Sequence, residues 1–216
     1  KNIRNLNKFL KERIHLLEQS DYDDNWISII EKKIVTTSYL VLSERNKVIE
    51  LINQKLIKIS EPFTSCKIVT SYKSEENFFS LNEDQFIVEY LNILKLKRNI
   101  DKEISRTTVN VNSVKFDIFK AKGSMMDSKD CSTGEQKSML ISIILSVCRI
   151  IKSVSLDTSL IILIDEAMAH FDEKHRSKLF DELNNLNCQT WYSGVSKELF
   201  KSISDQTVFF EVKSNI

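Results

Sequence analysis

The sequence predicts a mixed α/β chain in two parts, and three observations carry that prediction. Residues 1–60 have helical apolar spacing with a single interruption and contain neither glycine nor proline. From Ser132 onward, helical and β-rich segments alternate, which is typical of a parallel α/β layer. With 42% hydrophobic and 28% charged residues, the chain can bury a core and is not of the disordered class. We therefore expect a helical lateral domain with a few strands at 1–106 and an α/β lobe at 107–216.

The first part is expected to begin with an antiparallel helical hairpin. Leu6, Leu10 and Leu17 recur at helical spacing, and the polar run 21–25 then breaks the pattern before a second helix begins near Trp26. The elements that follow are expected to be a strand at 66–72, a helix at 83–104, short strands at 107–111 and 115–119, and a polar loop at 121–130.

The second part is expected to alternate regularly. Its predicted elements are helices at 133–154, 173–186 and 197–203, with strands at 160–165, 189–193 and 207–213.

Composition excludes several classes of protein. The net charge of +1 gives no overall basic field of the kind that marks many nucleic-acid binders. The four cysteines show neither C-x-x-C spacing nor a nearby histidine pair, so we expect reduced thiols in a cytoplasmic protein rather than a zinc site. No apolar run is long enough for a membrane span, and no signal peptide is evident. The missing initiator methionine suggests a portion of a longer protein.

The segment from Ser132 to Gln136 predicts a helix start suited to a phosphate. Ser132 followed three residues later by Glu135 forms a capping box, and Gly134 allows close approach of another backbone. Exposed amides such as that of Thr133 and the positive end of the helix dipole favour an anion here. The alternative is an ordinary capped helix of the core, because the residues that follow are strongly apolar.

The aliphatic run 160–164 predicts a strand buried on both faces, and two carboxylates follow it. Asp165 lies at the carboxyl end of that strand, where open α/β sheets bind ligands and where Mg²⁺ finds a carboxylate. Glu166 is placed to orient or deprotonate an attacking water. The alternative is an acidic strand end that only meets solvent or caps a turn.

Two further segments have functional and structural interpretations. Asp172 is a good helix N-cap, and the run from His170 to Asp172 is also a candidate for a loop at a dimer interface. Ser193 and Gly194 lie at the end of a predicted strand and offer a hydroxyl and backbone amides to a terminal phosphate such as a γ-phosphate, although a plain strand-end turn is an equal alternative. His175 is interpreted as a surface histidine.

Basic residues gather in two stretches of the first part. On helices they form solvated faces more often than nucleic-acid contacts, and they would favour DNA only if they converged in space. The residues are Lys1, Arg4, Lys8, Lys11 and Arg13, then Lys95, Lys97, Arg98 and Lys102.

Together these segments resemble the RecF family of DNA-repair ATPases, which is related to the SMC ATPases. The resemblance covers nearly the whole chain, is greatest to α-proteobacterial forms, and identifies the chain as the C-terminal portion of such a protein. Residues 1–60 resemble the lateral arm of that family. The segments that carry it are Cys131–Lys137, Leu163–Glu166, His170–Asp172, Arg176, Leu179–Phe180 and Gln189–Gly194.

The resemblance implies the C-terminal half of a P-loop, ABC-type ATPase head. It implies that Ser132, Thr133, Gly134 and Gln136 approach the γ-phosphate of ATP held by the opposite subunit.

The resemblance also implies roles for the acidic residues. Asp165 would meet Mg²⁺, through water, and Glu166 would be the catalytic base. His170 and Asp172 would lie in the loop that crosses the dimer.

The family resemblance implies partners as well. These are DNA at gaps or single-stranded/double-stranded junctions, a second copy bound in an ATP-dependent homodimer, and RecO- and RecR-type mediators that load recombinase. The implied setting is cytoplasmic recombination, repair and the SOS response. ATP hydrolysis would require the N-terminal lobe with its glycine-rich, lysine-bearing loop, which these residues lack.

The chain departs from the family at one further point, since Asn110–Phe116 stands where a Gly-x-His-Arg-x-Asp-Phe-like segment is expected. Two alternatives to a RecF-like ATPase stay open. One is another SMC-type or ABC ATPase head, with residues 1–60 as the base of a longer coiled coil. The other is a truncated, inactive interaction module.

Overall fold

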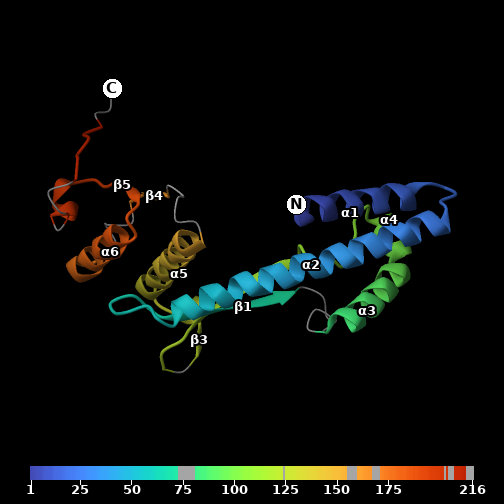
Figure 1. Ribbon diagram of the computed structural model, residues 1–216, viewed down its shortest axis with the longest axis horizontal. Helices are drawn as coiled ribbons and strands as arrows, with labels where there is room; N and C mark the ends of the chain where they lie inside the picture. The colour runs from blue at the N-terminus through green and yellow to red at the C-terminus, as the bar shows by residue number, and fades with distance from the viewer. Residues whose placement is uncertain are drawn as a thin grey trace. The chain divides into compact units, whose positions relative to one another are not determined.

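The computed structural model divides the chain into two compact units, each described here by itself (Figure 1). Unit 1 comprises residues 1–50 and 68–117, and unit 2 comprises residues 51–67 and 118–216. The described residues are 1–72, 81–123, 125–154, 160–166, 171–201, 203 and 207–212.

Unit 1 is built on the predicted helical hairpin. Helix α1 (Asn2–Glu18) lies beside the long helix α2 (Asp24–Leu56) and antiparallel to it (Figure 1). The polar break between them ends in an Asp23 carboxylate that accepts a hydrogen bond from the Asn25 amide at 2.8 Å, which caps the start of α2. Helices α3 (Glu83–Leu96) and α4 (Arg98–Glu103) complete the helical part of this unit.

The apolar core of unit 1 joins α1, α2 and α3. Its members are fully or almost fully buried, and those on the helices recur at helical spacing, as the sequence pattern predicted. They include Leu6, Ile30, Ile34, Val35, Phe86, Tyr90, Leu94, Val109 and Val111. The Tyr90 hydroxyl donates to the Val109 carbonyl at 2.8 Å, and burial raises the pKa of Tyr90.

A buried arginine crosses this core. Arg13 has no exposed surface, and its guanidinium donates to Glu31 at 3.0 Å and to Asp101 at 2.7 Å. It also donates to the Thr107 hydroxyl at 3.1 Å and to the Leu94 carbonyl at 2.7 Å. Arg13 was predicted as part of a basic helix face. The structure instead makes it a link between α1, α2, α4 and the segment after α4.

The strand predicted at 107–111 is wrong, because its polar groups bond to side chains instead of a neighbouring strand. The Thr108 amide donates to Asp101 at 2.9 Å, and the Val111 carbonyl accepts from Arg45 at 2.6 Å. The helix predicted at 83–104 is divided at Lys97, which ends α3 and begins α4. Strands at 66–72 and 115–119 are confirmed as β1 (Cys66–Tyr72) and β2 (Val114–Lys120).

Unit 2 contains the predicted α/β alternation. Helix α5 (Thr133–Val154) has the predicted bounds, and β4 (Ile161–Ile164) pairs in parallel with β5 (Gln189–Tyr192). Helix α6 (Glu173–Asn185) lies between these strands in the sequence and is joined to α5 by an ion pair between Arg149 and Glu182.

The loop predicted at 121–130 has more structure than expected. Residues Met126–Asp127 form β3, which pairs antiparallel with the end of β2, and Ser128–Asp130 form a 3₁₀ turn, η2. The strands are ordered β1-β2-β3 in this sheet.

The end of the chain differs from its predicted elements. The helix predicted at 197–203 is a short 3₁₀ turn, η4, over Lys197–Phe200. The described residues 207–212 of the last predicted strand form no strand. The expected domain ranges 1–106 and 107–216 differ from the two contact units, and as functional domains they stay a prediction.

Candidate functional site

The capping box at the start of α5 forms as the sequence predicted. The Ser132 hydroxyl accepts a hydrogen bond from the Glu135 amide at 3.3 Å, and Glu135 Oε2 accepts from the Ser132 amide at 3.0 Å and from its hydroxyl at 2.9 Å. These bonds satisfy two donors at the helix start. Ser132, Thr133, Gly134 and Gln136 are exposed.

Lys120 at the end of β2 also binds this box, which the sequence analysis did not predict. Its ammonium lies 2.6 Å from Glu135 Oε1, so each carboxylate oxygen of Glu135 has its own partner. The lysine contact, followed by the Ser132 bonds, lowers the pKa of Glu135 to about 2. No local pattern announces this pair, because the two residues are fifteen positions apart in the sequence.

Gln136 holds the segment just before the helix. Its amide nitrogen donates to the carbonyls of Ser128 at 2.9 Å and Cys131 at 3.1 Å. Gly134, in contrast, has open space where a Cβ would stand. Neither close packing nor a positive φ within this chain requires a glycine at that position.

A second cluster lies at the carboxyl ends of β4 and β5. The Ser193 hydroxyl donates to the Asp165 carboxylate and accepts from the Glu166 amide at 2.9 Å. The Ser193 amide donates to the Ile164 carbonyl at 3.0 Å, which continues the parallel pairing of the two strands. The structure therefore brings together the predicted carboxylates and the predicted sensor serine.

Glu166 occupies an uncommon backbone conformation. Its φ of +48° lies in the left-handed region, which costs a non-glycine residue roughly 1–3 kcal/mol. The bond from its amide to Ser193 holds this turn. Both Asp165 and Glu166 are exposed, so their carboxylates are accessible to a ligand.

Gly194 has a structural reason within this chain. A Cβ at this position would lie 2.8 Å from the ring of Phe200, which is closer than side chains tolerate. The structure thus favours a packing explanation for Gly194, whereas Ser193 contacts the acidic pair directly.

Asp172 caps α6, as its sequence position predicted. Its carboxylate accepts from the His175 amide at 2.8 Å, and these bonds lower the pKa of Asp172. The His175 ring lies 2.8 Å from the same carboxylate and stacks on Phe171, and Phe63 packs edge-on against both rings. His175 therefore belongs to an aromatic cluster and is not a simple surface histidine. His170 lies outside the described residues.

The site residues thus fall into three groups by contact. Ser132–Gln136 form one group with Lys120, Asp165 and Glu166 form another with Ser193, and Asp172 forms a third with His175. Within the described residues, no cluster of three or more histidine, cysteine or acidic side chains forms a ready-made cation site.

The prediction that the strand at 160–164 is buried on both faces is wrong for this chain, because one face of the β4–β5 pair is apolar and exposed. Ile161, Leu163 and Trp191 are 58%, 74% and 50% exposed, and Phe210 stacks on Trp191. The opposite face, with Ile162 and Ile164, is buried. Parallel strands are normally covered on both faces, so this surface has the character of an interior one.

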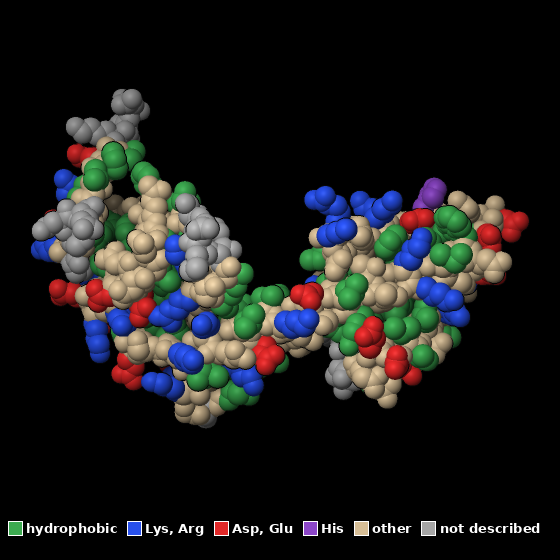
Figure 2. All heavy atoms as spheres, in the orientation of Figure 1, with side chains coloured by type: hydrophobic (Ala, Val, Ile, Leu, Met, Phe, Trp, Pro, Cys, Tyr) green, Lys and Arg blue, Asp and Glu red, His purple; other side chains and the backbone are tan. Residues whose placement is uncertain are grey.

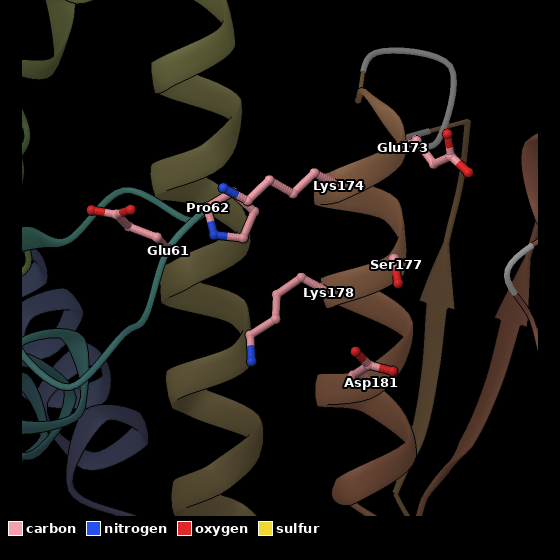
Figure 3. A pocket seen from close by; sticks show the side chains of 7 residues that line it. All are labelled: Glu61, Pro62, Glu173, Lys174, Ser177, Lys178 and Asp181. Carbon is pink, nitrogen blue, oxygen red and sulfur yellow. The ribbon is translucent and has the colours of Figure 1, made fainter.

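An open depression of about 580 Å³ lies on unit 2 (Figure 3). Lys174 extends from α6 toward Pro62 (Figure 3), and Lys178 forms an ion pair with Glu182 at 3.1 Å. None of its lining residues is a predicted site residue, and the lysines alternate with acidic groups rather than converging on a ligand. We assign it no role. Its lining is Glu61, Pro62, Glu173, Lys174, Ser177, Lys178 and Asp181.

Some basic residues of the two predicted stretches are bound to acidic residues of this chain. Arg13 is buried in the core, and Arg98 binds Glu31 at 2.6 Å and Asp24 at 2.9 Å. On the visible face, basic and acidic side chains are interspersed (Figure 2). Among the described helices, none is long and apolar enough to cross a membrane.

Comparison with known sequences relates the chain to RecF proteins. It is 30% identical to the DNA replication and repair protein RecF of Rickettsia bellii over 188 residues, which are 87% of this chain and 51% of that protein. It is 32% identical to the RecF of Rickettsia peacockii over 191 residues, which are 88% of this chain and 52% of that protein. The chain spans about half the length of the curated relatives it matches.

A family model and a solved structure add to this. A model described as SLIDE matches residues 29–130, which is less than half of the chain and ends before α5. The structure of the recombination mediator protein RecF-ATPrS in the RecFOR pathway matches 94% of this chain and 54% of its own, with a TM-score of 0.69 and 18% identity. These matches confirm the predicted resemblance: over about nine tenths of its length, this chain is RecF-like in sequence and in fold.

Proposed function

We propose that this chain is the C-terminal portion of a RecF-like DNA-repair ATPase and supplies two groups of active-site residues to it. The observation that carries the proposal is the Asp165–Glu166–Ser193 cluster at the end of a parallel strand pair, in a chain similar to half of a RecF protein. Ligands bind at such strand ends in open α/β sheets.

In this proposal, Asp165 and Glu166 have different roles at the carboxyl end of β4. Asp165 is held by the Ser193 hydroxyl and remains exposed, which suits a contact to Mg²⁺ that takes its other ligands from phosphate and water. Glu166 is exposed at the same strand end, and in this proposal its carboxylate orients or deprotonates the attacking water. The strain at Glu166 supports a functional role, because such strain collects at active sites.

The start of α5 acts in trans in this proposal. Ser132, Thr133, Gly134 and Gln136 approach the γ-phosphate of ATP bound to a second subunit, with Asp172 near the same interface. Support comes from the exposed helix start and the space around Gly134. ATP binding then drives a homodimer, since each nucleotide is completed by the partner.

The remaining half of the protein supplies the groups that hold ATP in cis. The exposed apolar face of β4 and β5 supports this division, because an interior-type surface requires a cover. We also propose that the assembled protein binds DNA at gaps or junctions, works with RecO- and RecR-type mediators to load recombinase, and acts in the cytoplasm.

ATP titration of residues 1–216 alone tests the proposal. We expect no saturable binding in the micromolar range, and micromolar affinity without the other half would overturn it.

The assembled protein provides the second test. Glu166→Gln should slow ATP hydrolysis at least about 100-fold while the ATP-bound dimer still forms in size-exclusion chromatography. Unchanged turnover would remove Glu166 from its role. Glu173→Gln, which alters an exposed glutamate at the start of α6, is the matched control.

A further inference from the structure

We propose that Lys120 is a positioning residue for the start of α5, and that it prepares this helix end for a phosphate-bearing ligand by neutralising Glu135. This inference rests on the proposed function. It adds a residue outside the motif, on a different secondary-structure element, to the groups that act in trans.

Glu135 presents an electrostatic conflict at this position. A carboxylate in the first turn stabilises the helix through the dipole and completes the capping box. The same negative charge repels a polyphosphate that approaches the exposed residues Thr133 and Gly134 at the helix start. The capping role and the proposed binding role therefore make opposite demands on one side chain.

The contact with Lys120 resolves this conflict. The ammonium lies 2.6 Å from Glu135 Oε1, while Oε2 stays on the Ser132 amide and hydroxyl at 3.0 and 2.9 Å. The Glu135 carboxylate is thus bound to Ser132, and its negative charge is compensated by Lys120. The side chains of both ion-pair partners are about one third exposed, so the pair is accessible to solvent and ions.

Lys120 also anchors the segment that precedes the helix. Lys120 pairs with Met126 across the β2–β3 ladder, and η2 follows β3 directly. Gln136 then binds the Ser128 and Cys131 carbonyls from inside α5. The ion pair binds Lys120 to Glu135, and the Gln136 bonds hold the residues just before the helix, while Ser132, Thr133 and Gly134 stay exposed. A helix start that is held in this way needs little rearrangement to bind an anion.

Three variants of the Lys120–Glu135 pair test the role of its charges. Lys120→Met leaves Glu135 uncompensated, Lys120→Arg keeps the charge, and Lys120→Met with Glu135→Gln removes both charges. Lys122→Met is the matched control, because Lys122 lies two residues further on and, among the described residues, its ion pair is with the exposed Glu61 at 3.3 Å. Thermal melting of each variant reports whether it is folded.

The first measurement is ATP-dependent dimerisation of the assembled protein. Lys120→Met should raise the ATP concentration needed for half-maximal dimerisation about tenfold, and Lys122→Met should leave it unchanged. Lys120→Arg should recover most of the loss, and the double variant should recover part of it, because it removes the uncompensated charge without restoring the ion pair. A purely structural role predicts no recovery in the double variant, and that result, or equal behaviour of the two methionine variants, would overturn the proposal.

The second measurement separates this proposal from the proposed function. Amide hydrogen exchange at residues 133–136 of the chain alone needs no ATP, and Lys120→Met should accelerate it about tenfold while Lys122→Met does not. If the wild type shows no ATP-dependent dimer, the proposed function fails and with it the phosphate role, whatever the exchange shows. If the wild type dimerises and exchange is unaffected by Lys120→Met, Lys120 is not a positioning residue.

Discussion

Replacing Arg13 with methionine tests whether the buried charge cluster holds unit 1 together. The change removes a guanidinium with no exposed surface and leaves Glu31 and Asp101 without it. Glu31 keeps two bonds from Arg98, at 2.6 and 3.0 Å. Among the described residues, the Asp101 carboxylate keeps the amide and hydroxyl of Thr108, at 2.9 and 2.7 Å, and neither of these donors carries a charge. Asp101 therefore becomes the uncompensated buried charge.

Breaking a buried ion pair from one side costs about 3–5 kcal/mol, which is a large fraction of the stability of an ordinary domain. Arg13→Met should therefore lower the urea midpoint of unit 1 by about 2 M. Adding Asp101→Asn should recover about 1–3 kcal/mol, because the amide no longer requires a cation.

The two tryptophans make this measurable, since Trp26 lies in unit 1 and Trp191 in unit 2. With Trp191→Phe as the background, tryptophan fluorescence reports unit 1 alone during urea unfolding. Lys11→Met removes an exposed cation from the same helix and should change the midpoint little. If Arg13→Met and Lys11→Met differ by less than about 1 kcal/mol, the cluster does not stabilise the unit and the reasoning fails.

Three further predictions concern unit 2. Ser193→Ala should destabilise it by about 1–2 kcal/mol in urea unfolding followed by Trp191 fluorescence, because the Asp165 and Glu166 partners lose a shared hydroxyl; no change would contradict this. The Glu135 pKa is lowered from 4.5 to about 2, so its contribution is present above pH 4.5 and lost toward pH 2. The difference in melting temperature between wild type and Glu135→Gln should shrink across that window, and a constant difference would refute it. Gly134→Ala should stabilise the isolated chain by up to about 1 kcal/mol yet weaken ATP-dependent dimerisation, and unimpaired dimerisation would mean that nothing approaches Gly134 closely.

Local signals account for the elements that the sequence predicted well. The bounds of α5 follow from a capping box and a continuous apolar helix pattern, both of which act within a few residues. The end of β4 was also predictable, because an aliphatic run followed by two carboxylates is a local pattern. The contact of Ser193 with that end follows from the parallel register of β4 and β5.

The failures have a common cause in partners that are distant in the sequence. The segment 107–111 has β-rich composition, but Asp101 and Arg45 bind its backbone. Arg13 looked like one of several surface cations, and its burial depends on Glu31 and Asp101, which are 18 and 88 positions away. Propensity describes a residue in isolation, whereas these groups are placed by tertiary contacts.

The two candidate groups in unit 2 are prepared in different ways, and this bears on how the proposed ATPase would be controlled. The start of α5 is held by the Lys120 pair and the capping box, with open space at Gly134, so it requires little rearrangement to receive a ligand. At the end of β4, Glu166 is strained and depends on one serine hydroxyl for its turn. Assembly is therefore expected to alter the Glu166 turn more than the helix start. In the proposed ATPase, the start of α5 would therefore bind the phosphates of ATP first, because it is already formed. Hydrolysis would follow only after the Glu166 turn at the end of β4 has adopted its active conformation.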